Sequence, residues 1–160
     1  MKKVIIIVLA VVVVIALIIG VVFAVLNKEK TPMTAEEFKT TMEAKNYVVI
    51  DATEQFAEYD YVKQVYLAVY SDNNYQIEFY ELSDEANAIA FYNNNKEMFE
   101  TYKGNASSNT EASFKNYSKF VLSASGKFMV ISRIANTAIY VNVDSSIEST
   151  VKELLKSLGY

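Results

Sequence analysis

Four carboxylates lie close together in one polar stretch of the sequence. Asp51, Glu54, Glu58 and Asp60 all fall within residues 51–60. Carboxylate oxygens bind hard cations, and two carboxyl groups about 5–10 Å apart in a cleft can act as the acid and base of a hydrolase. The spacing does not match the loop of an EF-hand. We therefore expect a solvated loop without a metal ion, and we keep a carboxylate-based hydrolase as an alternative function.

Other catalytic chemistries lack the side chains that they need. The chain contains no histidine and no cysteine, which excludes a serine–histidine triad, a thiol nucleophile and an ordinary zinc site. Residues 149–152 fit the pattern S-x-x-K, and residues 71–73 fit the S-D-N element that accompanies it in penicillin-recognising enzymes. Here S-D-N comes first and no K-T-G is present. We expect a non-enzymatic protein with no catalytic residue and no cofactor.

Tyrosines recur along the predicted strands and supply candidate binding residues. If the alternate aliphatic residues of the strand 62–70 face the core, Tyr66 and Tyr70 face away from it. Tyr80 and Tyr140 are expected to share that second face. A sheet face with several tyrosines can stack on a glycan or hold an envelope protein, because each tyrosine combines a rigid ring with a hydroxyl group. The alternative is that the rings pair across strands and only stabilise the sheet.

Arg133 is the only arginine and lies in the middle of a predicted strand. A guanidinium group at such a position can hold a carboxylate through two parallel hydrogen bonds. That carboxylate belongs either to a ligand or to a structural acid such as Glu78. Arg133 therefore joins the tyrosines as a candidate residue for ligand or partner binding.

A long apolar segment precedes all of these residues. From Val4 to Leu26 the chain has 23 consecutive residues without a charged side chain. As a helix, this segment is about 34 Å long, enough to cross a hydrocarbon core of about 30 Å. It exceeds the apolar region of a cleavable signal, about 7–15 residues, and no small-x-small cleavage site follows it. We expect a single transmembrane signal-anchor helix over residues 4–26, behind a short basic tail, residues 1–3.

The orientation of this anchor follows from its flanks. More lysines follow the segment than precede it, which by itself favours a cytoplasmic C-terminal part. Long domains, however, cross the membrane largely regardless of charge, and a short basic tail before an apolar run is the layout of an export signal. We expect the C-terminal domain to be extracytoplasmic and the protein to reside in the cell membrane.

Small side chains recur every fourth residue in the predicted anchor, at Ala16, Gly20 and Ala24. Such a row allows a second helix to approach closely. The row allows a homo-oligomer formed through the anchor; the alternative is that small residues, which are frequent in transmembrane helices, align here by chance. A further alternative function is an accessory subunit of a membrane complex, assembled through the same helix.

The composition of the chain limits the classes of partner that it can bind. From residue 27 onward the chain has 13 basic and 19 acidic residues, a net charge of 13 − 19 = −6. Such a surface repels phosphate backbones, so we expect no nucleic-acid partner. In its abundance of Lys, Asn, Tyr and Ile the chain has a general resemblance to single-pass surface proteins of AT-rich Gram-positive bacteria, without a motif that identifies a family. We expect a binding or interaction domain of a bacterial cell envelope.

The rest of the chain divides into a juxtamembrane linker, residues 27–33, and one α+β domain, residues 34–160. Thr34 and Glu37 form the capping box of a first helix, and Ser145 and Glu148 form that of the last helix. Strands are expected at 47–51, 62–70, 75–82, 117–123, 127–134 and 137–143, a second helix from Ser83, and a loop at 103–113. The predicted order is α-β-β-β-α-β-β-β-α. We expect a mostly antiparallel sheet with the helices packed on one face.

Overall fold

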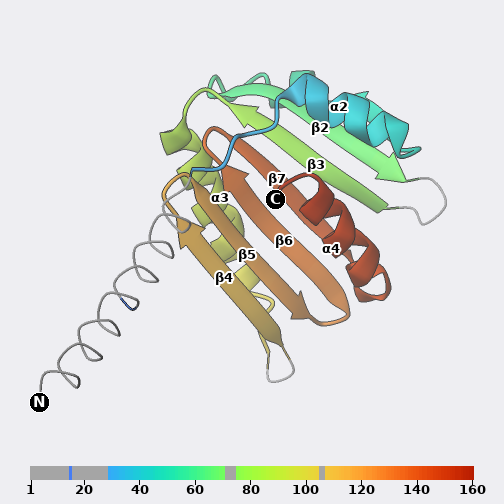
Figure 1. Ribbon diagram of the computed structural model, residues 1–160, viewed down its shortest axis with the longest axis vertical. Helices are drawn as coiled ribbons and strands as arrows, with labels where there is room; N and C mark the ends of the chain where they lie inside the picture. Colours follow the sequence, from blue (N-terminus) through green and yellow to red (C-terminus); the bar gives the residue numbers. More distant parts are fainter. Residues whose placement is uncertain (1–14, 16–28, 71–74, 105–106) are drawn as a thin grey trace, which may run out of the picture.

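The computed structural model describes residues 15, 29–70, 75–104 and 107–160. In this part of the chain, residues 29–160 form one α+β domain with a seven-stranded antiparallel sheet of order β1-β2-β3-β7-β6-β5-β4 (Figure 1). The strands are β1 (Val48–Asp51), β2 (Val62–Tyr70), β3 (Tyr75–Leu82), β4 (Ser108–Phe114), β5 (Tyr117–Ala124), β6 (Lys127–Ile134) and β7 (Thr137–Asp144). The helices are α2 (Ala35–Ala44), α3 (Glu85–Glu100) and α4 (Glu148–Ser157), with short 3-10 turns η1 (Thr53–Phe56) and η2 (Ser145–Ile147). The predicted α+β class and antiparallel sheet are confirmed.

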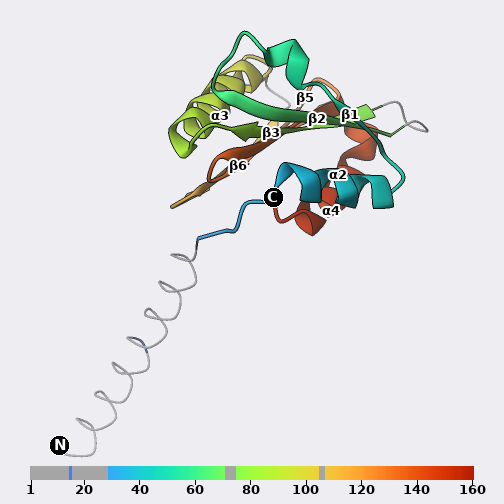
Figure 2. The same ribbon diagram turned by 90° about the horizontal axis from the view of Figure 1, so that it is seen from above.

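The helices cover both faces of the sheet, so the prediction that they share one face is wrong. Figure 2 shows α2 and α4 on one side of the sheet and α3 on the other. Phe38 of α2 and Leu155 of α4 belong to one core cluster, whereas Phe99 of α3 belongs to another. The reason lies in the inner strand β6, where every residue from Phe128 to Ile134 is buried. A strand with large apolar side chains on both faces needs a cover on both faces.

Strand β4 was not predicted from the sequence. It occupies most of the segment 103–113, which was predicted as a loop. It pairs with β5 over its whole length, from Ser108 opposite Ser123 to Phe114 opposite Tyr117. Six of its seven residues are exposed, so it lacks the apolar alternation that reveals a half-buried strand. An edge strand of this kind is held chiefly by backbone hydrogen bonds. The observed order is therefore α-β-β-β-α-β-β-β-β-α.

One of the two predicted capping boxes is present. Thr34 Oγ1 accepts a hydrogen bond of 3.2 Å from the amide of Glu37, and the amide of Thr34 donates to Glu37 Oε2 at 2.8 Å. The box predicted for Ser145 and Glu148 is wrong, because η2 precedes α4 and Asp144 accepts from the amide of Ser146 at 2.9 Å instead. Glu148 pairs with Lys152 one turn further along.

Among the described residues, no helix is long and apolar enough to cross a membrane. The predicted anchor, residues 4–26, lies outside the described part except for Ile15, which is helical and exposed. The row formed by Ala16, Gly20 and Ala24 also lies outside it, as does the S-D-N element at residues 71–73.

Candidate functional site

The structure places the candidate tyrosines on two opposite faces of the sheet. Tyr66 lies opposite Phe79, and its neighbour Val65 lies opposite Tyr80, so Tyr66 and Tyr80 point to different sides. Tyr66 and Tyr70 pack toward α2 and α4, whereas Tyr80 and Tyr140 pack toward α3. The prediction of one shared tyrosine face is therefore wrong. It assumed a sheet with a single buried face, and this sheet has two.

Tyr80 and Tyr140 are part of the core beside α3. Tyr80 is only 5% exposed, with its ring 4.5 Å from that of Phe91 and 5.6 Å from that of Phe56. Its hydroxyl donates to Glu78 Oε2 at 2.5 Å. Burial, followed by the adjacent Glu78 carboxylate, raises the pKa of Tyr80. Tyr140 is half-buried, and its ring lies 5.2 Å from that of Phe99. The packing of both rings stabilises the sheet and its helix.

Arg133 pairs with a structural acid under α3. Its Nη1 donates to Glu85 Oε1 at 2.9 Å, and its side chain is only 6% exposed. The structural acid named as an example was Glu78, but the partner is Glu85 in the first turn of α3, which strand pairing alone does not reveal. Within the described residues, Arg133 Nε is a buried polar atom without a hydrogen-bond partner. The ion pair fastens the start of α3 to β6.

Tyr70 belongs to a cluster of three tyrosines at one end of the sheet. Tyr70 and Tyr75 lie opposite each other where β2 ends and β3 begins, with ring centroids 5.6 Å apart. Tyr47 joins them from the segment before β1, with its ring 5.0 Å from that of Tyr70 and 6.0 Å from that of Tyr75. Asn46 directs the chain into this position with a φ of 65°, a conformation that asparagine tolerates well.

The buried side of this cluster is held by a hydroxyl pair. The hydroxyl oxygens of Tyr47 and Tyr75 are 2.5 Å apart and share a hydrogen bond. Tyr47 is 8% exposed and Tyr75 is 7% exposed, whereas Tyr70 is partly open to solvent. Burial, together with the hydrogen bond to Tyr75, raises the pKa of Tyr47. Tyr47 is thus a neutral phenol at physiological pH.

The three rings line a pocket of about 360 Å³ between the C-terminal end of α2 and the side of α4. Figure 1 shows these two helices on the same face, with β3 and β7 between them. The pocket is lined by Lys45, Tyr47, Tyr70, Tyr75, Thr150, Glu153, Leu154 and Ser157. The lining combines ring faces and hydroxyls with one cation and one carboxylate, which suits a ligand that is itself rich in hydroxyl groups.

A second pocket, of about 490 Å³, lies where β3 and β7 separate. Pairing between these strands begins at Ile77 opposite Val141, so residues 142–144 of β7 pair with β6 alone. Its lining is Val69, Tyr75, Gln76, Lys127, Asn142, Val143, Asp144, Ser146 and Ile147. Hydrogen bonds from Ser146 lower the pKa of Asp144, which keeps this carboxylate ionised. Although larger, this pocket contains a single aromatic ring, so we regard the tyrosine-lined pocket as the better candidate.

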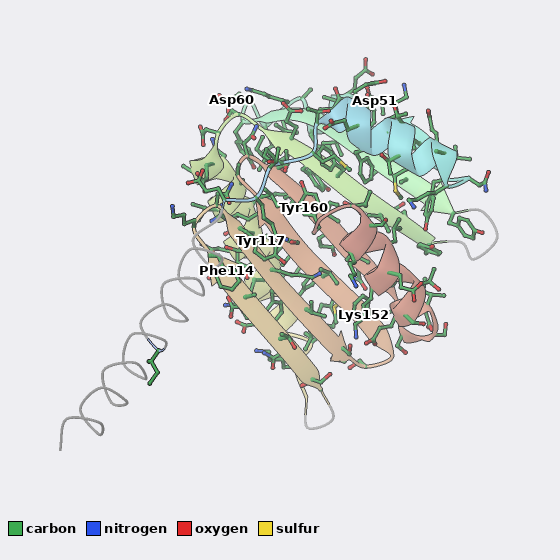
Figure 3. All side chains as sticks on the ribbon, in the orientation of Figure 1. Asp51, Asp60, Phe114, Tyr117, Lys152 and Tyr160 are labelled. Carbon is green, nitrogen blue, oxygen red and sulfur yellow. The ribbon has the colours of Figure 1, made fainter. Side chains whose placement is uncertain are left out.

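The acidic residues of the segment 51–60 do not enter either of these pockets. Asp51 accepts hydrogen bonds from Thr53, at 2.9 Å from its amide and 2.6 Å from its hydroxyl. These bonds lower the pKa of Asp51, the opposite of what a general acid requires. Figure 3 shows Asp51 and Asp60 well apart. Each pocket has one carboxylate, Asp144 or Glu153, and the described residues contain no acidic cluster that could hold a metal ion.

No family model matches the chain, and neither a curated protein nor a solved structure matches it.

Proposed function

We propose that this chain is a membrane-anchored, non-enzymatic binding protein of a bacterial cell envelope, with its binding site in the tyrosine-lined pocket. The observation that supports this is the pocket itself. Its volume of about 360 Å³ falls within the range of small-molecule sites, about 300–1,000 Å³, and its lining combines aromatic rings with a few polar groups. The apolar segment Val4–Leu26 supports a membrane anchor with an extracytoplasmic domain.

The ligand class that best fits this lining is a short glycan. The partly exposed ring of Tyr70 offers a flat surface for a sugar ring, over a base formed by Tyr47 and Tyr75. The hydroxyl of Thr150 can exchange hydrogen bonds with sugar hydroxyls, and that of Ser157, which donates to the carbonyl of Leu154 at 2.8 Å, can accept one. A pocket built from neutral rings with one charge of each sign does not select for a strongly charged ligand.

The lining also favours binding over catalysis. A carboxylate-based hydrolase needs two carboxyl groups that converge on one bond, whereas this pocket contributes Glu153 alone. Tyr47, whose pKa is raised by burial, is a poor proton donor or nucleophile near neutral pH.

The test is binding of the full-length protein, reconstituted in lipid nanodiscs, to an array of bacterial envelope glycans. Truncation of a central aromatic contact typically costs about 2 kcal/mol or more, which corresponds to about 30-fold weaker binding. We expect Tyr70→Ala to cause such a loss for the glycan that wild type binds. Tyr102→Ala is the matched control, because Tyr102 is 48% exposed and lies outside the pocket.

Three results of this experiment have different meanings. Loss of binding in Tyr70→Ala alone supports the proposal. If both variants bind the glycan as tightly as wild type, the glycan binds outside the tyrosine-lined pocket. If the wild-type protein captures no glycan, the proposal of a glycan ligand is wrong. Alkaline extraction of cell membranes and protease treatment of intact, wall-stripped cells test the anchor and its orientation separately.

A further inference from the structure

The segment that follows the predicted anchor is fastened to the domain. The backbone amide of Lys30 donates to Asn116 Oδ1 at 3.0 Å, and Asn116 Nδ2 donates to the carbonyl of Lys30 at 2.7 Å. Lys30 Nζ also donates to the carbonyl of Gly159 at 2.7 Å and lies 3.7 Å from the centroid of the Tyr117 ring. These contacts are called the Lys30 clasp below. Residues 29–33, predicted as part of a linker, therefore begin at a defined point of the domain.

The Lys30 clasp lies at the end of the sheet away from the tyrosine-lined pocket. Asn116 is in the turn between β4 and β5, at the end where β2 starts with Val62. Tyr70 ends β2 and lines the pocket. Eight residue steps of about 3.3 Å separate Val62 from Tyr70, so the two ends of the sheet are about 26 Å apart. Figure 1 shows the segment that starts at residue 29, in blue, next to the start of β5.

The short segment between the predicted anchor and Glu29 limits how far the clasped end can lie from the predicted membrane surface. Only Asn27 and Lys28 separate Leu26, the last residue of the apolar segment, from Glu29. Three steps of about 3.8 Å allow at most about 11 Å between the Cα atoms of Leu26 and Glu29. If the apolar segment spans the bilayer, as the proposed function requires, the clasped end of the domain must lie at the membrane surface.

The corner beside the clasp carries an exposed aromatic residue and an exposed base. Phe114 is 42% exposed and stacks on Tyr117, with ring centroids 6.4 Å apart and an interplanar angle of 6°. Lys115 is half-exposed, and its Nζ lies 3.9 Å from Glu29 Oε1. Figure 3 shows Phe114 and Tyr117 on the side of the molecule where the chain enters the domain. Aromatic rings and lysines are the side chains that favour the boundary between hydrocarbon and headgroups.

We propose that Phe114 and Lys115 insert into the headgroup layer of the membrane in which the chain is anchored. The Lys30 clasp then keeps the clasped end of the sheet at the membrane surface, so that the tyrosine-lined pocket lies at the end away from the bilayer. The partner of this corner is a lipid surface: the ring of Phe114 enters the apolar boundary, and the ammonium group of Lys115 meets lipid phosphates. The domain as a whole is acidic, so the contact depends on this corner and on its tether.

The chain contains no tryptophan, which makes a direct test possible. Full-length Phe114→Trp protein is reconstituted in vesicles of phosphatidylglycerol and phosphatidylcholine, with or without bromine on the acyl chains. We expect bromine to quench the fluorescence of Phe114→Trp and the emission to shift to shorter wavelength. Tyr102→Trp is the control, because Tyr102 is 48% exposed and follows α3, which ends beside the far part of the sheet. Its fluorescence should be the same in both kinds of vesicle.

Two further variants complete the experiment. One tests the Lys30 clasp, and the other supplies a second fluorescent reporter in case Phe114→Trp does not fold. Adding Asn116→Ala to Phe114→Trp removes both side-chain hydrogen bonds to Lys30 and should reduce the quenching. Lys115→Trp introduces the reporter at a neighbouring exposed position and replaces Phe114→Trp if that variant does not fold.

Retention on vesicles after an alkaline wash separates the two proposals. A retained chain in which the Phe114→Trp and Lys115→Trp variants are quenched no more than Tyr102→Trp overturns the lipid contact and leaves the anchor intact. A chain that the wash releases overturns both the anchor and the contact that depends on it.

Discussion

The hydroxyl groups of Tyr47 and Tyr75 share a buried hydrogen bond of 2.5 Å at the base of the tyrosine-lined pocket. This bond joins the segment that leads into β1 to the start of β3, two parts of the chain that are not neighbours in the sheet. It fixes the position of two of the three rings on which a ligand is proposed to rest. Its contribution can be measured directly, because phenylalanine keeps the ring and removes only the hydroxyl.

Replacement of both hydroxyls should destabilise the domain by less than the sum of the two single replacements. Tyr47→Phe or Tyr75→Phe leaves the other hydroxyl buried without its partner, which costs about 1–3 kcal/mol of unfolding free energy. The double variant leaves no orphaned group and should lie closer to wild type than the sum of the two losses. Urea unfolding of all four proteins, followed by circular dichroism, gives the coupling. Strictly additive losses would contradict the pairing.

Alkaline pH should destabilise the domain through its buried tyrosines. Burial raises the pKa of Tyr47 and of Tyr80 in the folded protein, whereas an unfolded tyrosine titrates near about 10. Above that pH the unfolded chain has released protons that the folded chain still holds, so unfolding is favoured. Each such tyrosine lowers the unfolding free energy by about 1.4 kcal/mol per pH unit above pH 10. Below pH 10 both states are protonated, and the contribution is constant.

Urea unfolding at a series of pH values around and above 10 measures this slope. Tyr80→Phe removes one titrating group and should make the slope less steep. Tyr102→Phe is the control, because Tyr102 is 48% exposed. A Tyr80→Phe protein with the wild-type slope would show that Tyr80 ionises as easily in the folded state as in the unfolded one.

Loss of the acid that pairs with Arg133 should destabilise the packing of α3 on the sheet. Glu85→Gln leaves the buried guanidinium without its carboxylate, and a hydrogen bond to a charged group contributes about 1.5–3 kcal/mol. Glu97→Gln changes an exposed carboxylate of the same helix and should alter stability by less than about 0.5 kcal/mol. Thermal and urea unfolding compare the two variants. Equal losses would mean that the ion pair adds nothing beyond a surface charge.

The Lys30 clasp should make the first residues after the predicted anchor part of the folded unit. A fragment that starts at Glu29 keeps the three hydrogen bonds of Lys30, whereas one that starts at Thr31 loses them. At about 1 kcal/mol for each net hydrogen bond, the longer fragment should be more stable by about 1–3 kcal/mol. Asn116→Ala should destabilise the longer fragment and have little effect on the shorter one. Equal stability of the two unmodified fragments would contradict the clasp.

Local sequence patterns predicted most of the elements correctly. The hairpin strands Val62–Tyr70 and Tyr75–Leu82 are observed with the bounds predicted for them, because alternation and a polar turn are local signals. The same holds for the capping box of α2, because its two residues are three positions apart in the sequence. The edge strand β4 was missed, since its stability depends on pairing with β5 and not on its own side chains.

The site was harder to predict than the elements. Tyr70 was among the candidate residues, but Tyr47 and Tyr75 were not, because the cluster needs the pairing of β1, β2 and β3 as well as the position of α4. A partial signal was present: Tyr70 and Tyr75 flank the hairpin turn, and hairpin pairing places such residues opposite each other. Alternation alone could not assign a side chain to a helix-covered face, because it does not reveal that both faces are covered.

The exposed edge of β4 affects how the domain behaves when many copies of it lie close together. An unpaired strand edge is a template for pairing with another chain, and long apolar edges promote aggregation. The edge residues here are mostly serine, asparagine and threonine, and Glu111 is held by Lys96 at 2.6 Å. A second copy that added a strand along Ser108–Ser113 would have to displace water from polar side chains, and Phe114 at the end of the strand is the one large apolar side chain that it could bury. The edge therefore favours separate domains over continuous sheets between neighbours, even at the high local concentration that the proposed membrane anchor would produce.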